Sequence, residues 1–254
     1  MKEKIYTIPV MDAFLTEDEC PFCYVERKLE EHALDFTLGP GASYMESDVR
    51  EATDAAGFCR THYKKMYDYG NRLGTGLILK THFKKLNQEL NDEIKKFSPS
   101  HTSVFGKLKK KSGDGRTSIG EWSHSKEESC YICNFYKDSF ARYMDTFFEM
   151  YKADPELRKK FADSKGLCMP HFGDLTDAAD RILSDKDKKE FFDVLFPLQQ
   201  KNMQRLFEDL DWFCDKFDYR NKDADWKNSK DAVPRGMQKA GGGYPDMEPY
   251  TSDR

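Results

Sequence analysis

The sequence lacks the features that mark exported and membrane-spanning proteins. It has no run of about 18 uncharged apolar residues, and no apolar signal segment follows Met1. We therefore expect a soluble protein in the cytoplasm that does not enter a membrane.

Linear signatures of common enzymes are also missing. No GxGxxG nucleotide-binding loop, no phosphate-cradling Gly-Lys-Ser or Gly-Lys-Thr loop, no HExxH and no GxSxG occurs in the 254 residues. Many active sites have no linear motif, so an enzyme stays an alternative. We predict no catalytic residues.

Strand signals are nearly absent, because the sequence has no Asn-Gly turn and no sustained alternation of Val, Ile and Thr. Apolar residues instead recur at steps of three and four over 79–97 and 203–217, and good helix formers fill 24–38 and 134–150. The fold is therefore predicted to be all-α. We expect a kink or break where helix-breaking residues fall within these helices, at Gly70, Gly74, Gly76 and Pro197.

Six of the seven cysteines belong to a duplicated pattern. A slide of about 110 residues brings Cys20-Pro-Phe-Cys23 onto Cys130-Tyr-Ile-Cys133 and Gly57-Phe-Cys59-Arg-Thr-His62 onto Gly166-Leu-Cys168-Met-Pro-His171. The two pairs are separated by 35 residues in the first copy and by 34 in the second. The seventh, Cys214, has no counterpart, and we expect it to be a buried apolar side chain.

Three thiols and one imidazole are ligands that Zn²⁺ prefers, and a reducing cytoplasm keeps thiols free to bind it. Two cysteines in a CxxC turn can reach one ion, and a CxxH pair at a helix start can supply two more ligands. We therefore predict two zinc ions, each held within one repeat. The first quartet is Cys20, Cys23, Cys59 and His62, and the second is Cys130, Cys133, Cys168 and His171.

These sites are predicted to be structural, because protein ligands fill all four positions. Iron–sulfur clusters bound by the same residues are the alternative. The competing explanation is that the cysteines simply pack in a core.

The duplication predicts four parts of the chain. Residues 1–97 form a first metal-binding helical repeat, 98–129 a polar linker, 130–217 a second metal-binding repeat, and 218–254 a polar C-terminal strap and disordered tail. Each repeat is clasped by its own Cys3His site, and the two repeats are expected to pack into one pseudo-symmetric helical body.

Charge is distributed unevenly along the chain. Between Arg60 and Lys111, thirteen Lys and Arg face four acidic residues, a net charge of +9, although the whole chain carries −4. This basic stretch favours nucleic-acid binding as an alternative function, and the acidity of the remainder counts against it. A further alternative is an enzyme with a pocket between the repeats and the C-terminal strap that uses Asp218, Tyr219, Arg220 or Asp225. If the sites hold iron–sulfur clusters, the protein would be a redox protein.

The order of the motifs, closing with Lys216-Phe-Asp-Tyr-Arg-Asn-Lys-Asp-Ala-Asp-Trp226, resembles a family of uncharacterised proteins from anaerobic, clostridia-type bacteria. The resemblance extends to about Lys239 and implies a bacterial cytoplasmic protein, but no activity. It departs at Cys130-Tyr-Ile-Cys133, which lacks the proline of the first pair, and at Lys227, where a small residue is expected.

The same resemblance implies that the segment 217–232 matters as much as the metal quartets, and we consider Tyr219, Arg220 and Trp226 a candidate binding surface. The leading hypothesis is a non-enzymatic, zinc-stabilised helical scaffold. Its surface would bind an unidentified protein or small-molecule partner.

Overall fold

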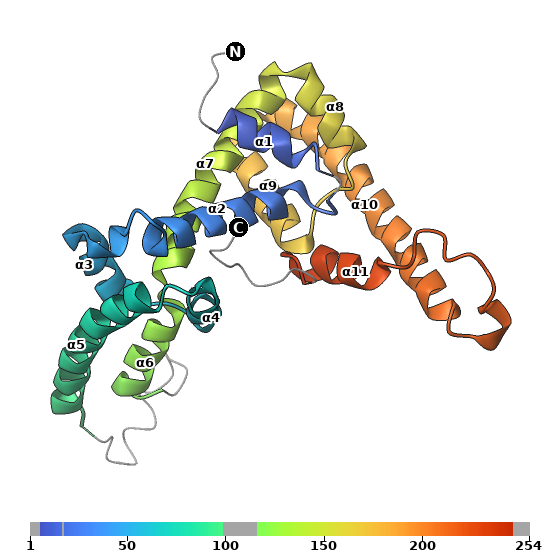
Figure 1. Cartoon of the computed structure of the whole chain (residues 1–254). Coiled ribbons are helices and arrows are strands. Elements are labelled where there is room, and N and C mark those ends of the chain that lie inside the picture. Colours follow the sequence, from blue (N-terminus) through green and yellow to red (C-terminus); the bar gives the residue numbers. More distant parts are fainter. Residues whose placement is uncertain (1–5, 17, 99–115, 246–254) are drawn as a thin grey trace, which may run out of the picture. The chain divides into compact units, whose positions relative to one another are not determined.

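The structure of the chain is a computed structural model in which residues 6–16, 18–98 and 116–245 are described. Over these residues the chain forms α-helices and short 3-10 helices and contains no β-strand (Figure 1). The predicted all-α fold is confirmed. None of the helices in this part of the chain is long and apolar enough to cross a membrane.

The helices follow one another in the same order in both copies of the duplicated sequence. The first copy contains α1 (Thr7–Ala13), α2 (Pro21–Leu38), η1 (Ser43–Met45), α3 (Ser47–Ala56), α4 (Arg60–Tyr69) and α5 (Arg72–Lys96). The second contains α6 (Ser118–Glu128), α7 (Tyr131–Ala153), α8 (Pro155–Asp163), α9 (Met169–Ile182) and α10 (Asp185–Asp215), and η3 (Tyr219–Asn221) and α11 (Ala232–Gly241) follow.

The predicted breaks are only partly present. Gly70 ends α4 in the left-handed conformation (φ 87°), and the side chain of Asn71 then caps α5 by accepting the N–H of Gly74. Pro197, in contrast, lies inside a continuous α10. The predicted polar linker 98–129 contains α6, which begins at Ser118 after the cap residue Thr117. Its basic run 107–111 lies outside the described residues.

The helices form two compact units, and each unit combines parts of both repeats. Of the described residues, the first unit contains 6–16, 18–29 and 137–245, and the second contains 30–98 and 116–136. The division falls inside α2 and α7, which each contribute their first turns to one unit and their remainder to the other. These limits differ from the predicted boundaries at 97 and 130.

Aromatic side chains fill the core of the first unit. Phe22 at the start of α2 packs edge-to-face on Phe147 of α7, with ring centroids 5.5 Å apart, and Phe161 of α8 stacks on Phe191 of α10 at the same distance. All four rings are almost completely buried. Such large buried aromatic surfaces contribute strongly to stability. In the same unit, α11 packs against α9 and α10 (Figure 1).

The core of the second unit is mainly aliphatic. It gathers Leu34 and Leu38 of α2, Met66 of α4, Ile78 of α5 and Ile132 of α7, all buried. Helix α3 packs along α5, and the two lie side by side in Figure 1. Each unit therefore has its own hydrophobic core and its own set of helix starts, on which the metal ligands lie.

Candidate metal centres

The eight predicted ligands converge in two groups of four, one in each unit. Site 1 consists of Cys20, Cys23, Cys168 and His171, and site 2 consists of Cys59, His62, Cys130 and Cys133. Within each group the donor atoms all lie within 4.8 Å of one another.

This grouping corrects the predicted one. Each site takes the CxxC pair of one repeat and the CxxH pair of the other, so neither repeat holds a quartet of its own. Each site has the expected set of residues, three cysteines and one histidine. The two repeats differ from the prediction only in which CxxC pair lies beside which CxxH pair.

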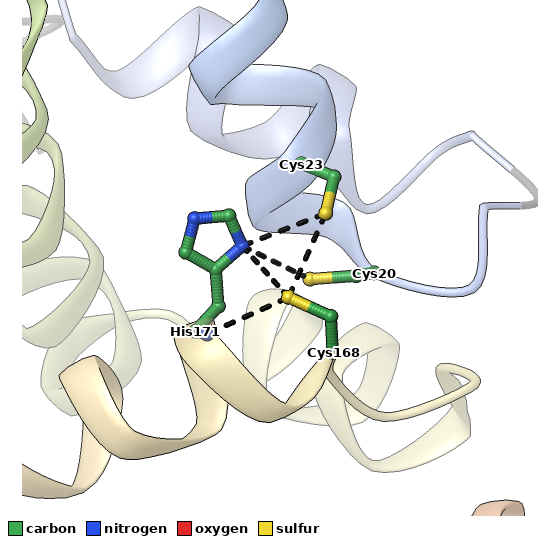
Figure 2. A group of neighbouring side chains, drawn as sticks. All are labelled: Cys20, Cys23, Cys168 and His171. Carbon is green, nitrogen blue, oxygen red and sulfur yellow. Dashed lines mark hydrogen bonds between the residues drawn. The ribbon is translucent and has the colours of Figure 1, made fainter. Parts of the chain in front are cut away.

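Site 1 joins the start of α2 to the start of α9 (Figure 2). Cys20 directly precedes α2, and Cys168 is the N-cap residue of α9, where its sulfur accepts the backbone N–H of His171. The Nδ1 atom of His171 lies 3.4 Å from Cys20 Sγ, 3.6 Å from Cys23 Sγ and 3.2 Å from Cys168 Sγ, and the sulfurs of Cys23 and Cys168 are 3.7 Å apart.

Site 2 repeats this arrangement at the starts of α4 and α7. The Nδ1 atom of His62 lies 3.2 Å from Cys59 Sγ, 3.2 Å from Cys130 Sγ and 3.4 Å from Cys133 Sγ. The sulfurs of Cys59 and Cys133 are 3.9 Å apart. Cys59 is the N-cap residue of α4, as Cys168 is of α9.

These distances can be compared with those of a tetrahedral zinc ion. With Zn–S of about 2.3 Å and Zn–N of about 2.0–2.1 Å, two sulfurs lie about 3.8 Å apart and a sulfur and a nitrogen about 3.6 Å apart. The observed sulfur–sulfur distances of 3.7 and 3.9 Å and the nitrogen–sulfur distances of 3.2–3.6 Å approach both values. The donor set therefore fits a single tetrahedral ion at each site.

The cysteines and the histidine of each site shift one another's pKa values. Burial alone would raise the pKa of Cys130, but hydrogen bonding from His62 lowers it to about 6. Burial alone would lower the pKa of His62, but its hydrogen bonds to Cys130 and Glu30 raise it to about 10. In site 1, burial would raise the pKa of Cys20, but hydrogen bonds with Cys168, Cys23 and His171 lower it. Burial would lower the pKa of His171, but its hydrogen bonds with Cys168 and Cys20 raise it to about 10. Because a metal ion binds thiolates and a neutral imidazole, its binding here would release the protons of the thiols and of the histidine.

Two glutamates of α2 lie beside the ligand histidines, and sequence reasoning missed both. Glu30 Oε1 lies 2.9 Å from Nε2 of His62, and the other oxygen of Glu30 is bound by Lys65. Glu26 Oε2 lies 3.6 Å from Nε2 of His171. A carboxylate on the far nitrogen fixes the tautomer and orientation of a metal-binding imidazole, so that Nδ1 is left to the metal. The signal that the sequence offers is a pair of glutamates, which follow Cys23 by three and seven positions.

A glycine two residues before each CxxH cysteine sets the turn into the helix. Gly57 and Gly166 have φ of 61° and 74°, a region that residues with a Cβ rarely adopt. A Cβ on Gly57 would lie 2.8 Å from the ring of His82, and one on Gly166 would lie 2.9 Å from Gln199 Oε1. Gln199 also bonds both the N–H and the carbonyl of Leu167, which holds this turn in place.

The missing proline of the second CxxC pair has a structural explanation. The backbone N–H of Tyr131 donates to the carbonyl of Gly57 over 2.9 Å and so ties α7 to the turn before Cys59. The equivalent residue of the first pair, Pro21, has no N–H and cannot make this bond. The two sites are therefore similar but not equivalent.

Their exposure also differs. All four ligands of site 1 are buried, whereas Cys59 and Cys133 of site 2 are half-buried. Cys59 lines a cavity of about 420 Å³ together with Tyr63 and His82. Small reagents can therefore approach site 2 more readily than site 1.

The candidate surface at Tyr219, Arg220 and Trp226 is built around a buried lysine. The ammonium of Lys216 donates to the carbonyls of Asn221, Lys222 and Ala224 over 2.6–2.8 Å and lies 5.2 Å from the centre of the Trp226 ring. Tyr219 is 81% exposed, whereas Arg220 is paired with Asp218. The hydrogen bonds of Lys216 thus hold the backbone of residues 221–224 in its fold. That Tyr219 binds a partner stays a prediction.

The structure also bears on two further expectations, the burial of Cys214 and the free charge of the basic stretch. Cys214 is exposed, so the prediction that it is a buried apolar side chain was wrong. In the described part of the basic stretch, several cations are paired with carboxylates, which leaves less free positive charge for nucleic acid: Arg60, Lys64, Lys65, Lys95 and Lys96.

Comparison with known proteins gives one match. No curated protein and no solved structure matches the chain. Residues 1–247 match the family described as a family of unknown function, DUF6062. This span includes both candidate metal sites and the C-terminal segment. The chain therefore belongs to the family of unknown function DUF6062.

Proposed function

We propose that this protein binds two zinc ions as structural centres, one in each compact unit. The observation that carries the proposal is the convergence of three thiols and one imidazole at each site, with all donor atoms within 4.8 Å. Three thiolates and an imidazole suit zinc before other common divalent metals. An iron–sulfur cluster fits less well, because several iron atoms hold their ligands farther apart than one ion does.

The zinc ions would be structural and not catalytic. Protein supplies all four ligands at each site, which leaves no coordination position for water or substrate. Each ion would link two helix starts that are far apart in the sequence, and the binding energy of a structural ion stabilises the fold. A non-enzymatic scaffold in a reducing cytoplasm, where thiols stay free, agrees with seven unpaired cysteines.

Elemental analysis of the purified protein tests this function. We expect about two zinc ions per chain. Visible absorbance of protein purified without oxygen would reveal iron–sulfur clusters in their place. A chain that contains neither zinc nor iron would refute the metal-binding proposal.

Paired substitutions test which ligands share an ion. Cys20→Ser combined with Cys168→Ser should remove one ion, because both residues belong to site 1. Cys20→Ser combined with Cys59→Ser should remove both ions, because the residues belong to different sites. Sites assembled within each repeat would give the opposite result for the second pair, namely the loss of one ion.

A further inference from the structure

The first unit contains a cavity that is separate from the metal ligands. It has a volume of about 870 Å³ and lies between the turn after α8, the middle of α10 and the C-terminal segment before α11. This volume is in the range of sites that bind small organic molecules. The enzyme alternative expected a pocket between the repeats and the C-terminal strap, with Asp218, Tyr219, Arg220 or Asp225. None of these four residues lines this cavity, and the strap residues that do begin at Lys227.

Positive charge predominates on the lining. Three carboxylates face six cations, which are Lys165, Lys201, Arg205, Lys227, Lys230 and Arg235. The two arginines are committed to internal contacts, since Arg205 and Arg235 both bind Glu19 and Asp209. Among the residues that the structure describes, Lys201 and Lys230 have no carboxylate partner. Their ammonium groups are therefore available to an anion.

The wall of the cavity is held in place before any ligand binds. Glu19 is 2% exposed and forms an ion pair with the equally buried Lys239 over 3.2 Å. The ammonium of Lys239 also donates to the carbonyls of Glu19 and Lys165 over 2.6 Å each. This network anchors α11 and the turn after α8, so little ordering cost remains for binding.

Lys227, the position where a small residue was expected, has a strained backbone. Its φ of 53° lies in the left-handed region, and its N–H donates to the Asp225 side chain over 2.8 Å. Its ammonium lies 4.0 Å from the centre of the Trp212 ring. Strain of this kind persists where surrounding contacts fix a residue, and it is frequent at binding sites.

The lining also has an apolar side, formed by Ala162, Val194, Pro197 and Leu198. We propose that the cavity binds an organic phosphate ester. Its phosphate would bind Lys201 and Lys230, and its apolar part would pack against Pro197 and Leu198. Several lysine ammonium groups suit the double charge of a phosphate monoester, because each acts as a compact cation with several donors.

Equilibrium dialysis with 1-naphthyl phosphate tests the proposal on the full chain as purified. This probe combines a phosphate with an apolar ring, and 1-naphthol and inorganic phosphate each supply one half of it. We expect the ester to bind at least about tenfold more tightly than either half, since each half forgoes one set of contacts. Equal binding of the ester and 1-naphthol would overturn the role of the lysines.

A matched pair of variants locates the binding. Lys201→Gln combined with Lys230→Gln should weaken binding of the ester at least about tenfold, while Lys186→Gln combined with Lys189→Gln should leave it unchanged. Both double variants remove two positive charges, and Lys186 and Lys189 lie on α10 outside the cavity lining. Equal affinities in the two variants, or no binding to the unmodified protein at low salt, would refute the site. The measurement does not depend on the proposed zinc ions.

Discussion

Gly166 combines two constraints at a single residue. Its positive φ of 74° disfavours any residue with a side chain, and a Cβ at this position would lie against Gln199. The side-chain amide of Gln199 forms hydrogen bonds with both the N–H and the carbonyl of the next residue, Leu167. The turn delivers Cys168 and His171 to site 1. A small change here should therefore affect both the stability of the fold and the geometry of the site.

We predict that Gly166→Ala lowers the free energy of unfolding by about 1–3 kcal/mol. Gly173→Ala is the matched control, because Gly173 is exposed within α9 and has open space where the Cβ would lie. That substitution should be neutral or stabilise by up to about 1 kcal/mol, since alanine favours a helix over glycine. Chemical denaturation measures both changes, and an equal effect of the two variants would contradict the role of the turn.

Glu30 acts on site 2 through His62 and is a positioning residue. Replacing it with glutamine keeps the size of the side chain but removes the charge that holds the Nε2 proton and pairs with Lys65. We predict that Glu30→Gln weakens metal binding at site 2 by about 10–100-fold, as is typical for second partners of ligand histidines.

Competition with a chelator of known affinity gives the measurement. Glu51→Gln on α3 removes the same charge from an exposed position of the same unit and should leave the affinity unchanged. An unchanged affinity in Glu30→Gln would show that the contact with His62 does not orient the ligand.

At the scale of helices, the sites lie where helix starts meet. The N–H groups and dipole of a helix start favour thiolates, and Cys59 and Cys168 use this position as N-cap residues. One helix also serves both histidines, because Glu26 and Glu30 lie one turn apart on α2. The two sites nevertheless differ in access, since only site 2 has half-buried cysteines.

This difference predicts two rates of metal release. A chromophoric chelator should remove the ion of site 2 at least about tenfold faster than that of site 1, because half-buried thiolates are more open to attack than buried ones. Release should therefore show two phases of equal amplitude. The double variant Cys59→Ser, Cys130→Ser should lose the fast phase alone. A single phase, or a fast phase that survives in this variant, would contradict the prediction.

The exchange of ligands between repeats has a consequence for the whole molecule. Residues 1–98 supply Cys20 and Cys23 to site 1 and Cys59 and His62 to site 2, and residues 116–254 supply the other half of each site. Two ions would therefore connect the two halves of the chain. Cores built from both halves add to this connection.

We predict that cutting the chain between residues 98 and 116, at an inserted protease site, leaves the two fragments associated. Size-exclusion chromatography should show one species with metal bound, and a strong chelator should weaken the association, since structural metal contributes on the order of 10 kcal/mol. Fragments that separate while both ions stay bound would indicate quartets within each repeat. The uncut chain treated with the same chelator is the control.

Much of this organisation could be predicted from the sequence. The spacing of apolar residues predicted the long helices, because a helix must place one face on a core whatever it packs against. The duplicated CxxC and CxxH motifs identified the eight residues that converge, because a tight turn presents two ligands locally. The glutamates beside the histidines were missed, because their spacing from Cys23 does not identify the histidine that each one contacts.

Which CxxC meets which CxxH was decided only by the tertiary structure. Both pairings use the same donor types, so local chemistry cannot distinguish them. The two compact units can, because the chain passes from one unit to the other inside α2 and α7. Each CxxC pair therefore lies in the same unit as the CxxH pair of the other repeat. The helices and the eight candidate ligands could thus be predicted from local patterns, whereas the path of the chain decides which of these residues meet.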